Sequence, residues 1–152
     1  MLRIPHGLIE SFRACGIEKE TINTLQEIWS SSMPAHEKFA QLRASATTQG
    51  ATDLQIGNMN PALSMFGTQH PEDWTEILPH VVHIHGKFYG FDEMGDESSM
   101  DLARILKVFV KGGFSGFLSS EWEGHAYTDA VSGFDMVETH QSLCRRILDS
   151  NL

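Results

Sequence analysis

The stretch that most constrains the fold of this chain covers residues 78–90, where three polar side chains stand at alternate positions. The β-branched pair Val81-Val82 leads directly into His83, His85 and Lys87. Apolar residues followed by polar groups at the carboxyl end are typical of a buried parallel strand. Residues two apart on a strand point to the same face. Because functional sites in parallel α/β folds lie at the carboxyl ends of strands, we expect His85 to bind a metal ion or a substrate.

Length and charge limit the classes of protein that this chain can form. Its 152 residues suffice for one domain with a core, and 20 acidic residues against 11 Lys and Arg give a net charge of −9. Without a basic stripe we expect no nucleic-acid partner. The chain shows no signal-peptide core and no run long enough to cross a membrane, so we expect no membrane partner. Cys15 and Cys144 form no motif, which favours a reducing, cytoplasmic location.

The apolar spacing changes along the chain from helical only to an alternation of strands and helices. Residues 1–50 show helical patterns, which predicts a helical lead-in. From residue 51 the order becomes strand, helix, strand, helix, strand, helix, and this order predicts parallel strands with helical crossovers. We therefore expect one α/β domain over residues 1–152, with three β/α units in residues 51–152. The predicted strands are 53–57, the His-rich strand and 114–121, and the predicted helices are 71–78, 98–111 and a last one from about 132.

Each predicted strand ends in polar residues, and these ends share one edge of a parallel sheet. Asn58 follows the first strand, His85 closes the second, and Glu121 ends the third. Amide, imidazole and carboxylate donors together suit Mn²⁺, Mg²⁺ or Co²⁺, with Zn²⁺ a weaker match. We expect a divalent metal ion, Mn²⁺ first, held by His85, Glu121 and Asn58. A carboxylate beside such an ion could remove a proton next to a sugar carbonyl, which makes Glu121 the expected catalytic group.

Three further residues are expected to bind substrate, and each has a simpler alternative. Lys87 either binds a substrate oxygen or only forms an ion pair with Glu121 or Glu123. His83 either supports the neighbouring histidine or packs inside the protein. Glu123 either contacts substrate or is a solvated acid, and Asn58 is equally interpretable as a turn residue.

The stretch 83–87 followed by 113–121, Gly-Phe-Ser-Gly-Phe-Leu-Ser-Ser-Glu, resembles the last strands of the xylose-isomerase-like TIM barrels. These are divalent-metal-dependent sugar or sugar-phosphate isomerases and epimerases that transfer a proton next to a carbonyl. The resemblance implies that His85 and Glu121 are metal ligands and that Glu121 is also an acid/base group. The Asp of the family's metal site falls on Asn58, and its first Glu has no counterpart in this chain.

The resemblance covers only about residues 50–148, the last three strands of an eight-stranded barrel. A complete barrel needs on the order of 250 residues. We therefore expect the C-terminal part of a TIM barrel, incomplete in this chain. The expected partners are a small-molecule sugar, the missing barrel half or a partner subunit, or a second copy of the chain.

A narrower resemblance names a different reaction. The stretches 85–90 and 121–125 are similar to the large subunits of C-glycoside deglycosidases, two-subunit, metal-dependent lyases that act on 3-keto sugars attached to flavonoids.

A third interpretation is a non-catalytic barrel remnant that binds a partner chain or nothing. The His-x-His pattern also occurs in cupins, but the helical segments here contradict an all-strand fold, and the charge disfavours a DNA-repair nuclease.

Overall fold

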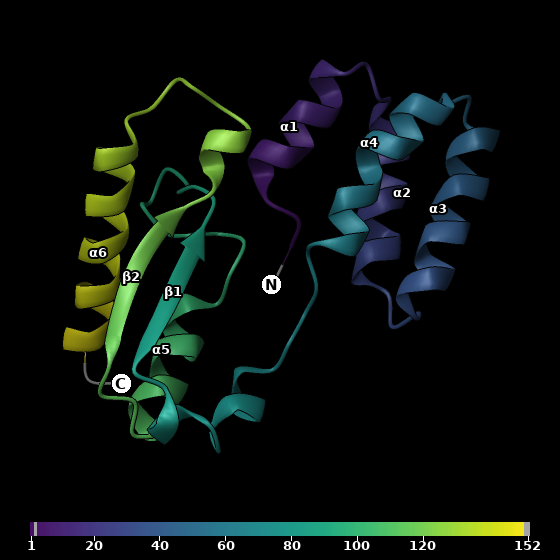
Figure 1. The fold of residues 1–152 in the computed structure, drawn as a ribbon. Helices are drawn as coiled ribbons and strands as arrows, with labels where there is room; N and C mark the ends of the chain where they lie inside the picture. Colours follow the sequence, from purple (N-terminus) through teal and green to yellow (C-terminus); the bar gives the residue numbers. More distant parts are fainter. Residues whose placement is uncertain (2, 151–152) are drawn as a thin grey trace. The chain divides into compact units, whose positions relative to one another are not determined.

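The computed structural model describes residues 1 and 3–150, which divide into two compact units (Figure 1). Met1 and residues 3–67 make up the first unit, and the second begins at Thr68. None of the helices in these residues has the length and apolar character needed to cross a membrane.

The first unit is a group of helices that bury their apolar stripes against one another. On α2, residues Ile22, Leu25 and Trp29 follow helical spacing and are buried. The Trp29 indole Nε1 donates a hydrogen bond of 2.9 Å to the carbonyl of Phe66, which joins α2 to the segment after the last helix of the unit. The helices are α1 (His6–Ala14), α2 (Lys19–Ser30), α3 (Ala35–Thr48) and α4 (Asp53–Ser64).

Residues 53–57, predicted as a strand, form the first turns of α4 instead. Thr52 caps this helix: its Oγ1 accepts from the Gln55 amide at 3.3 Å, and Gln55 Oε1 accepts from the Thr52 amide at 2.9 Å. This reciprocal capping box satisfies two amide groups that would otherwise lack partners at the helix start. Ile56 and Met59, three residues apart, are buried. The local capping chemistry thus outweighs a short alternation that suits either structure.

The second unit contains a small parallel sheet and two long helices. The elements are η1 (Pro71–Trp74), η2 (Leu78–His80), β1 (His83–Phe88), α5 (Leu102–Lys111), β2 (Phe117–Trp122), η3 (Gly124–Ala126) and α6 (Gly133–Asp149), where η denotes a 3₁₀ helix. The two strands are parallel, with His83 opposite Phe117 and Phe88 opposite Trp122. The helix predicted over 71–78 is only a pair of 3₁₀ turns.

Helices α5 and α6 pack against one face of this sheet (Figure 1). Leu106 and Phe109 of α5 and Leu143 of α6 form its buried core, and Ile84 of β1 and Leu118 of β2 pack against them. Because side chains alternate along a strand, the odd-numbered residues of β1, on either side of Ile84, face away from this core.

The prediction of a partial TIM barrel is wrong. The described residues are mostly helical, with six α-helices and a two-stranded parallel sheet. One of the three expected strands is the capped start of α4, so it adds nothing to the sheet. The helices before it bury their apolar residues within their own unit.

Gly116, just before β2, lies close to Val82, just before β1. A Cβ on Gly116 would lie 2.2 Å from the carbonyl oxygen of Val82, a backbone atom that cannot rotate away. We expect Gly116→Ala to lower the free energy of unfolding by about 1–3 kcal/mol. Gly90→Ala is the control, because a Cβ there meets nothing within 4 Å, and its effect should be below about 0.5 kcal/mol. Urea denaturation measures both, and equal stabilities of the two variants would contradict the close approach.

Candidate functional site

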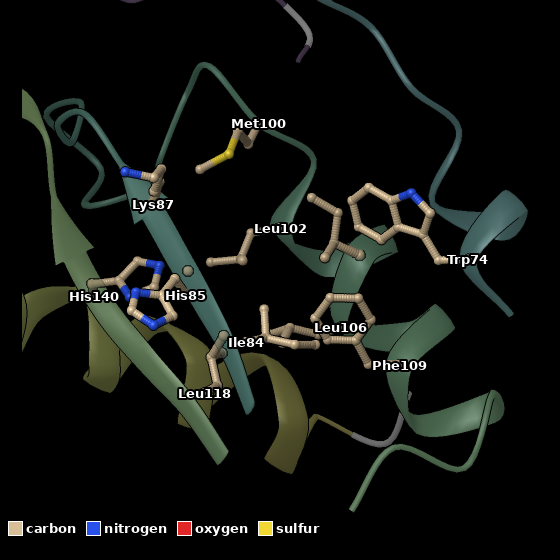
Figure 2. Close-up of a pocket in the computed structure, with 12 residues that line it drawn as sticks. Trp74, Ile84, His85, Lys87, Met100, Leu102, Leu106, Phe109, Leu118 and His140 are labelled. Atoms are coloured by element: carbon tan, nitrogen blue, oxygen red, sulfur yellow. The ribbon is translucent and has the colours of Figure 1, made fainter. Parts of the chain in front are cut away.

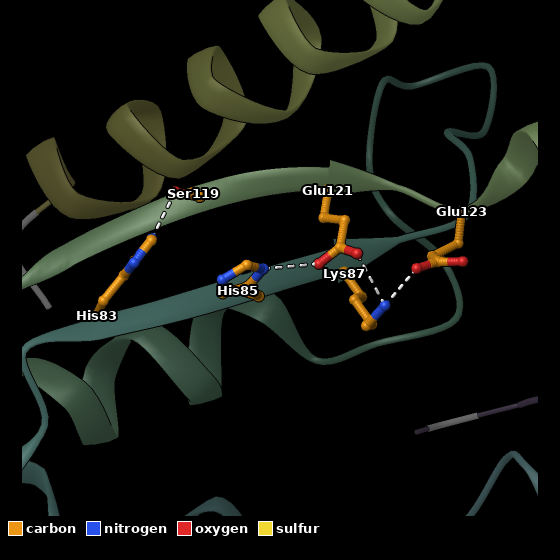
Figure 3. A network of polar contacts seen from close by, with 6 residues as sticks. All are labelled: His83, His85, Lys87, Ser119, Glu121 and Glu123. Atoms are coloured by element: carbon orange, nitrogen blue, oxygen red, sulfur yellow. Dashed lines mark hydrogen bonds and ion pairs between the residues drawn. The ribbon is translucent and has the colours of Figure 1, made fainter.

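Six polar side chains of the second unit form a continuous row on the sheet face opposite the core (Figure 3). They are His83, His85 and Lys87 of β1, Ser119 and Glu121 of β2, and Glu123 just after β2, and we call them the polar row. The parallel register sets Lys87 directly opposite Glu121. The side chains on this face therefore meet across the strand pair.

The polar row is linked by hydrogen bonds from one strand to the other. His83 Nε2 and Ser119 Oγ share a hydrogen bond of 2.6 Å. His85 Nδ1 lies 3.0 Å from Glu121 Oε2, and Lys87 Nζ donates to Glu121 Oε1 at 3.0 Å (Figure 3). Lys87 Nζ also donates to Glu123 Oε1. Glu121 thus receives a contact on each oxygen and is the centre of the row.

The contact with Glu121 orients the ring of His85. An ionised carboxylate only accepts hydrogen bonds, so Nδ1 of His85 carries the proton that is donated to it. In the neutral ring Nε2 is then the basic nitrogen, available to a ligand. The ring of His83 lies next to it, with a centroid separation of 4.9 Å.

Charge pairing shifts the pKa of two members of the row in opposite directions. Hydrogen bonds from Lys87, which has the larger effect, and from His85 lower the pKa of Glu121. Its carboxyl group therefore stays ionised at neutral pH. Hydrogen bonds to Glu123, which has the larger effect, and to Glu121 raise the pKa of Lys87, so its ammonium stays charged.

The polar row is open to solvent. The side chain of His85 is 64% exposed, and that of Glu121 is 38% exposed. Ion pairs at this exposure contribute little to the stability of the fold, so a contribution to stability does not explain why these side chains gather here. An accessible array of a carboxylate, imidazoles and an ammonium can bind and orient hydroxyl and carbonyl groups.

The opposite face of the strands is held by His140, a residue that the sequence analysis did not single out. Its ring stacks on Phe88 at a centroid separation of 4.3 Å, and its Nδ1 shares a hydrogen bond of 2.8 Å with Ser120 Oγ. Burial lowers the pKa of His140, so the ring is neutral at neutral pH. A Cβ on Gly86 would lie 3.5 Å from this ring and 3.0 Å from Leu118, which explains a glycine within the strand. The sequence feature that could have indicated this close packing was Gly86, between His85 and Lys87.

The structure brings together most of the residues predicted for the site. His83, His85, Lys87, Glu121 and Glu123 all belong to the polar row. Their roles in catalysis and substrate binding stay predictions.

Asn58 does not stand at the end of a strand. It is an exposed residue of α4, in the first unit, because the segment before it is helical. Within residues 1 and 3–150 no group of three or more His, Cys, Asp or Glu side chains could hold a metal ion. The expected manganese-binding centre is therefore not seen among these residues, where His85 and Glu121 form only a pair.

Comparison with known proteins identifies relatives of one kind. No family model matches the chain. The chain is 37% identical over 145 residues to a C-glycoside deglycosidase alpha subunit of Arthrobacter globiformis, covering 93% of this chain and 41% of that protein. It is 32% identical over 156 residues to a 3'-dehydrocarminate deglycosidase alpha subunit of a Microbacterium species, covering 97% and 45%. A C-glycoside deglycosidase alpha subunit of Microbacterium trichothecenolyticum is 31% identical over 148 residues, covering 91% and 40%.

These relatives correct the functional expectation from the sequence. Their names are those of deglycosidase subunits, so the assignment to the xylose-isomerase-like family, with its isomerase and epimerase activities, is wrong. The second resemblance drawn from the sequence, to C-glycoside deglycosidase subunits, agrees with the comparisons. The chain spans about two fifths of the length of the curated relatives that it matches.

The pairing of Glu121 with Lys87 makes a testable prediction about acidity. Because Lys87 is the main cause of the lowered pKa, we expect Lys87→Met to raise the pKa of Glu121 towards its ordinary value. Carbon NMR of the side-chain carboxyl groups during an acid titration measures this shift. Lys107→Met, an exposed lysine of α5, should leave that pKa unchanged. A Glu121 pKa that is equal in wild type and Lys87→Met would show that the two side chains are not paired in solution.

Proposed function

We propose that this chain contributes the polar row to a deglycosidase that cleaves a carbon–carbon glycosidic bond. The observation that carries the proposal is the similarity to deglycosidase alpha subunits, which extends over at least 91% of the chain. The polar row supports it, because a carboxylate between an imidazole and an ammonium suits proton transfer on a hydroxylated ligand.

The proposed substrate is a C-glycoside whose sugar carries a ketone at C3. One relative is named for a 3'-dehydro compound, which is a sugar oxidised at that carbon. A ketone at C3 acidifies the hydrogen on C2. When a base removes that proton, the electron pair forms a double bond between C1 and C2, the bond from C1 to the aglycone breaks, and the aglycone carbon takes up a proton. The reaction is an elimination in which the removed proton and the proton gained by the aglycone balance.

Glu121 is the proposed base for the proton on C2. Its lowered pKa keeps it in the required ionised form, but the same pairing with Lys87 weakens it as a base. The second contact of Lys87, with Glu123, offers a way round this conflict. A substrate oxygen that draws the ammonium of Lys87 towards itself and Glu123 would raise the basicity of Glu121 when the substrate is bound. His83 and His85 would orient sugar hydroxyl groups along the row.

A partner subunit is part of the proposal. The relatives are named alpha subunits, and this chain matches only part of their length. The polar row is open to solvent, whereas efficient proton transfer next to a ketone requires an enclosed site. We infer that other protein surfaces cover the row in the active assembly.

A divalent ion, with Mn²⁺ first, stays a proposal that rests on donor chemistry. His85 offers Nε2 to the ion, because its Nδ1 donates to Glu121, and the remaining ligands would come from other protein or water. When bound, such an ion would polarise the ketone oxygen. Titration with Mn²⁺ should raise the melting temperature of the chain, His85→Ala should abolish that shift, and His80→Ala, an exposed histidine outside the row, should retain it. A shift that survives His85→Ala would place the ion elsewhere.

A chimera tests the proposed reaction. The matching stretch of the Arthrobacter globiformis relative would be replaced by this chain, and release of the aglycone from a 3-keto C-glycoside would be measured with that protein's partner present. We expect activity in the chimera and at least about a hundredfold loss with Glu121→Gln, since general-base catalysis contributes roughly that much. Glu138→Gln, an exposed residue of α6, is the control and should keep activity. Activity that survives Glu121→Gln would remove this carboxylate from the mechanism.

A further inference from the structure

The polar row is continued past the end of β1 by Tyr89. The amide of Glu123 donates a hydrogen bond of 2.9 Å to the carbonyl of Phe88, so the strand pairing extends one step beyond the last residue of β2. Phe88 is buried on the core side, and because side chains alternate, Tyr89 follows Lys87 on the side of the row. The next step of the register sets Tyr89 opposite Glu123, which Figure 3 shows at the end of the row.

A second tyrosine packs against the first. The rings of Tyr89 and Tyr127 have centroids 6.5 Å apart, and both residues are half-buried. Tyr127 follows η3, and its amide donates a hydrogen bond of 2.9 Å to the carbonyl of Gly124. These are the only two tyrosines in the sequence. Two segments far apart in the chain therefore bring both of its phenol groups to the carboxyl end of the row.

The surroundings of Tyr89 favour its protonated form and also stabilise its phenolate. Burial raises the pKa of Tyr89, and the neighbouring Tyr127, Glu123 and Glu97 raise it further, whereas the ammonium of Lys87 lowers it. The phenol therefore keeps its proton at neutral pH. If the proton is given away, the ammonium of Lys87 lies close enough to stabilise the negative charge that remains.

The proposed elimination needs a proton donor as well as a base. Glu121 is ionised and takes the proton from C2, so it cannot also supply one. Lys87 is a weak acid, because its two carboxylate partners raise its pKa. The Nδ1 proton of His85 is donated to Glu121. A phenol that is protonated at neutral pH has the form that a general acid requires.

Spacing along the strand supports the same division of roles. Lys87 lies opposite Glu121, and Tyr89 is two residues further on, a rise of roughly 7 Å along the strand. A base and an acid at this spacing can contact the hydrogen on C2 and the aglycone carbon attached to C1 of one sugar. The aglycone would then lie towards the carboxyl ends of the two strands.

We propose that Tyr89 is the general acid that gives its proton to the aglycone carbon. The inference rests on the proposed function for the reaction itself. The electron pair of the bond from C1 to the aglycone takes the phenol proton, so one C–C bond and one O–H bond break and one C–H bond forms. Glu121 then releases the proton from C2 to water, and water returns a proton to the phenolate.

The test compares two leaving groups in the chimera with the Arthrobacter globiformis relative and its partner. With a 3-keto C-glycoside, Tyr89→Phe should lower kcat at least about a hundredfold, the usual contribution of general-acid catalysis. With the 3-keto O-glucoside of 4-nitrophenol, whose aglycone leaves as a stable anion, the same variant should stay within about twofold of the wild-type rate. Glu121→Gln should slow both substrates, because both need the base.

Tyr127→Phe is the matched control, since it removes the same hydroxyl group from the other ring of the pair and should keep both rates. The 4-nitrophenyl substrate also serves as the control for folding, because a misfolded Tyr89→Phe chimera would fail with both leaving groups.

An alkaline titration tests the position of Tyr89 without turnover. In the full chain Tyr127→Phe leaves Tyr89 as its one tyrosine, so the ultraviolet absorption of phenolate reports this residue alone. We expect a pKa above that of free tyrosine, and a further rise with Lys87→Met, because that variant removes the positive charge that lowers it. Lys107→Met, on α5, should leave the pKa unchanged.

The outcomes separate this inference from the proposed function. If Tyr89→Phe slows both substrates equally, or slows neither, Tyr89 is not the acid, while loss of activity with Glu121→Gln still supports the reaction. A Tyr89 pKa that does not respond to Lys87→Met would contradict its place beside the row. An inactive chimera would reject the proposed reaction and the proton transfer from Tyr89 together.

Discussion

The parallel pairing of β1 with β2 is the interaction on which the site depends. The register places Lys87 opposite Glu121, and every contact in the polar row follows from that alignment. A shift by one residue would turn the side chains of one strand to the other face. The register is held from the core side, where Ile84 and Leu118 pack on the helices and Ser120 bonds to His140. The buried face thus determines which polar groups meet on the open face.

Strand β1 serves two different surfaces with alternate residues. His83, His85 and Lys87 face solvent, whereas Ile84 and Phe88 pack against helices α5 and α6 or the ring of His140. Gly86 lets the backbone approach that ring closely. A short strand with a polar face and a packed face can therefore hold an accessible group of charges rigidly. This rigidity matters for acid–base chemistry, which depends on small differences in distance.

The pairing within the polar row could be predicted from the sequence, because alternation along a strand is a local pattern, and His85 and Glu121 meet at 3.0 Å. The expectation that the histidines follow a buried Val81-Val82 strand is wrong, since β1 begins at His83 and Val82 is exposed. The fold could not be predicted to the same extent. Residues 53–57 alternate like a strand, but the capping box of Thr52 and Gln55 starts a helix there, and this displaces Asn58 from the predicted edge. The capping motif of Thr52 and Gln55 is visible in the sequence, and it favours a helix over a strand of five residues.

Tertiary packing accounts for what local patterns missed. Nothing in the sequence around His140 distinguishes a buried histidine stacked on a phenylalanine from an exposed one, since the partner lies on a strand far away in the chain. An apolar cavity in the second unit is likewise lined by residues from η1, β1, α5, β2 and α6 that no single motif joins (Figure 2). A short pattern of strand ends resembled sugar isomerases, whereas the similarity over nearly the whole chain is to deglycosidase alpha subunits.

The position of the proton on the ring of His85 tests most directly whether the polar side chains of β1 and β2 contact each other. Nitrogen NMR of the histidine rings at neutral pH distinguishes a proton on Nδ1 from one on Nε2. The contact with the Glu121 carboxylate predicts that the neutral ring of His85 carries its proton on Nδ1, and that Glu121→Ala returns it to the Nε2 form usual for an unpaired ring. A wild-type ring protonated on Nε2 with a bare Nδ1 would contradict the contact between His85 and Glu121, and with it the polar row as a working unit.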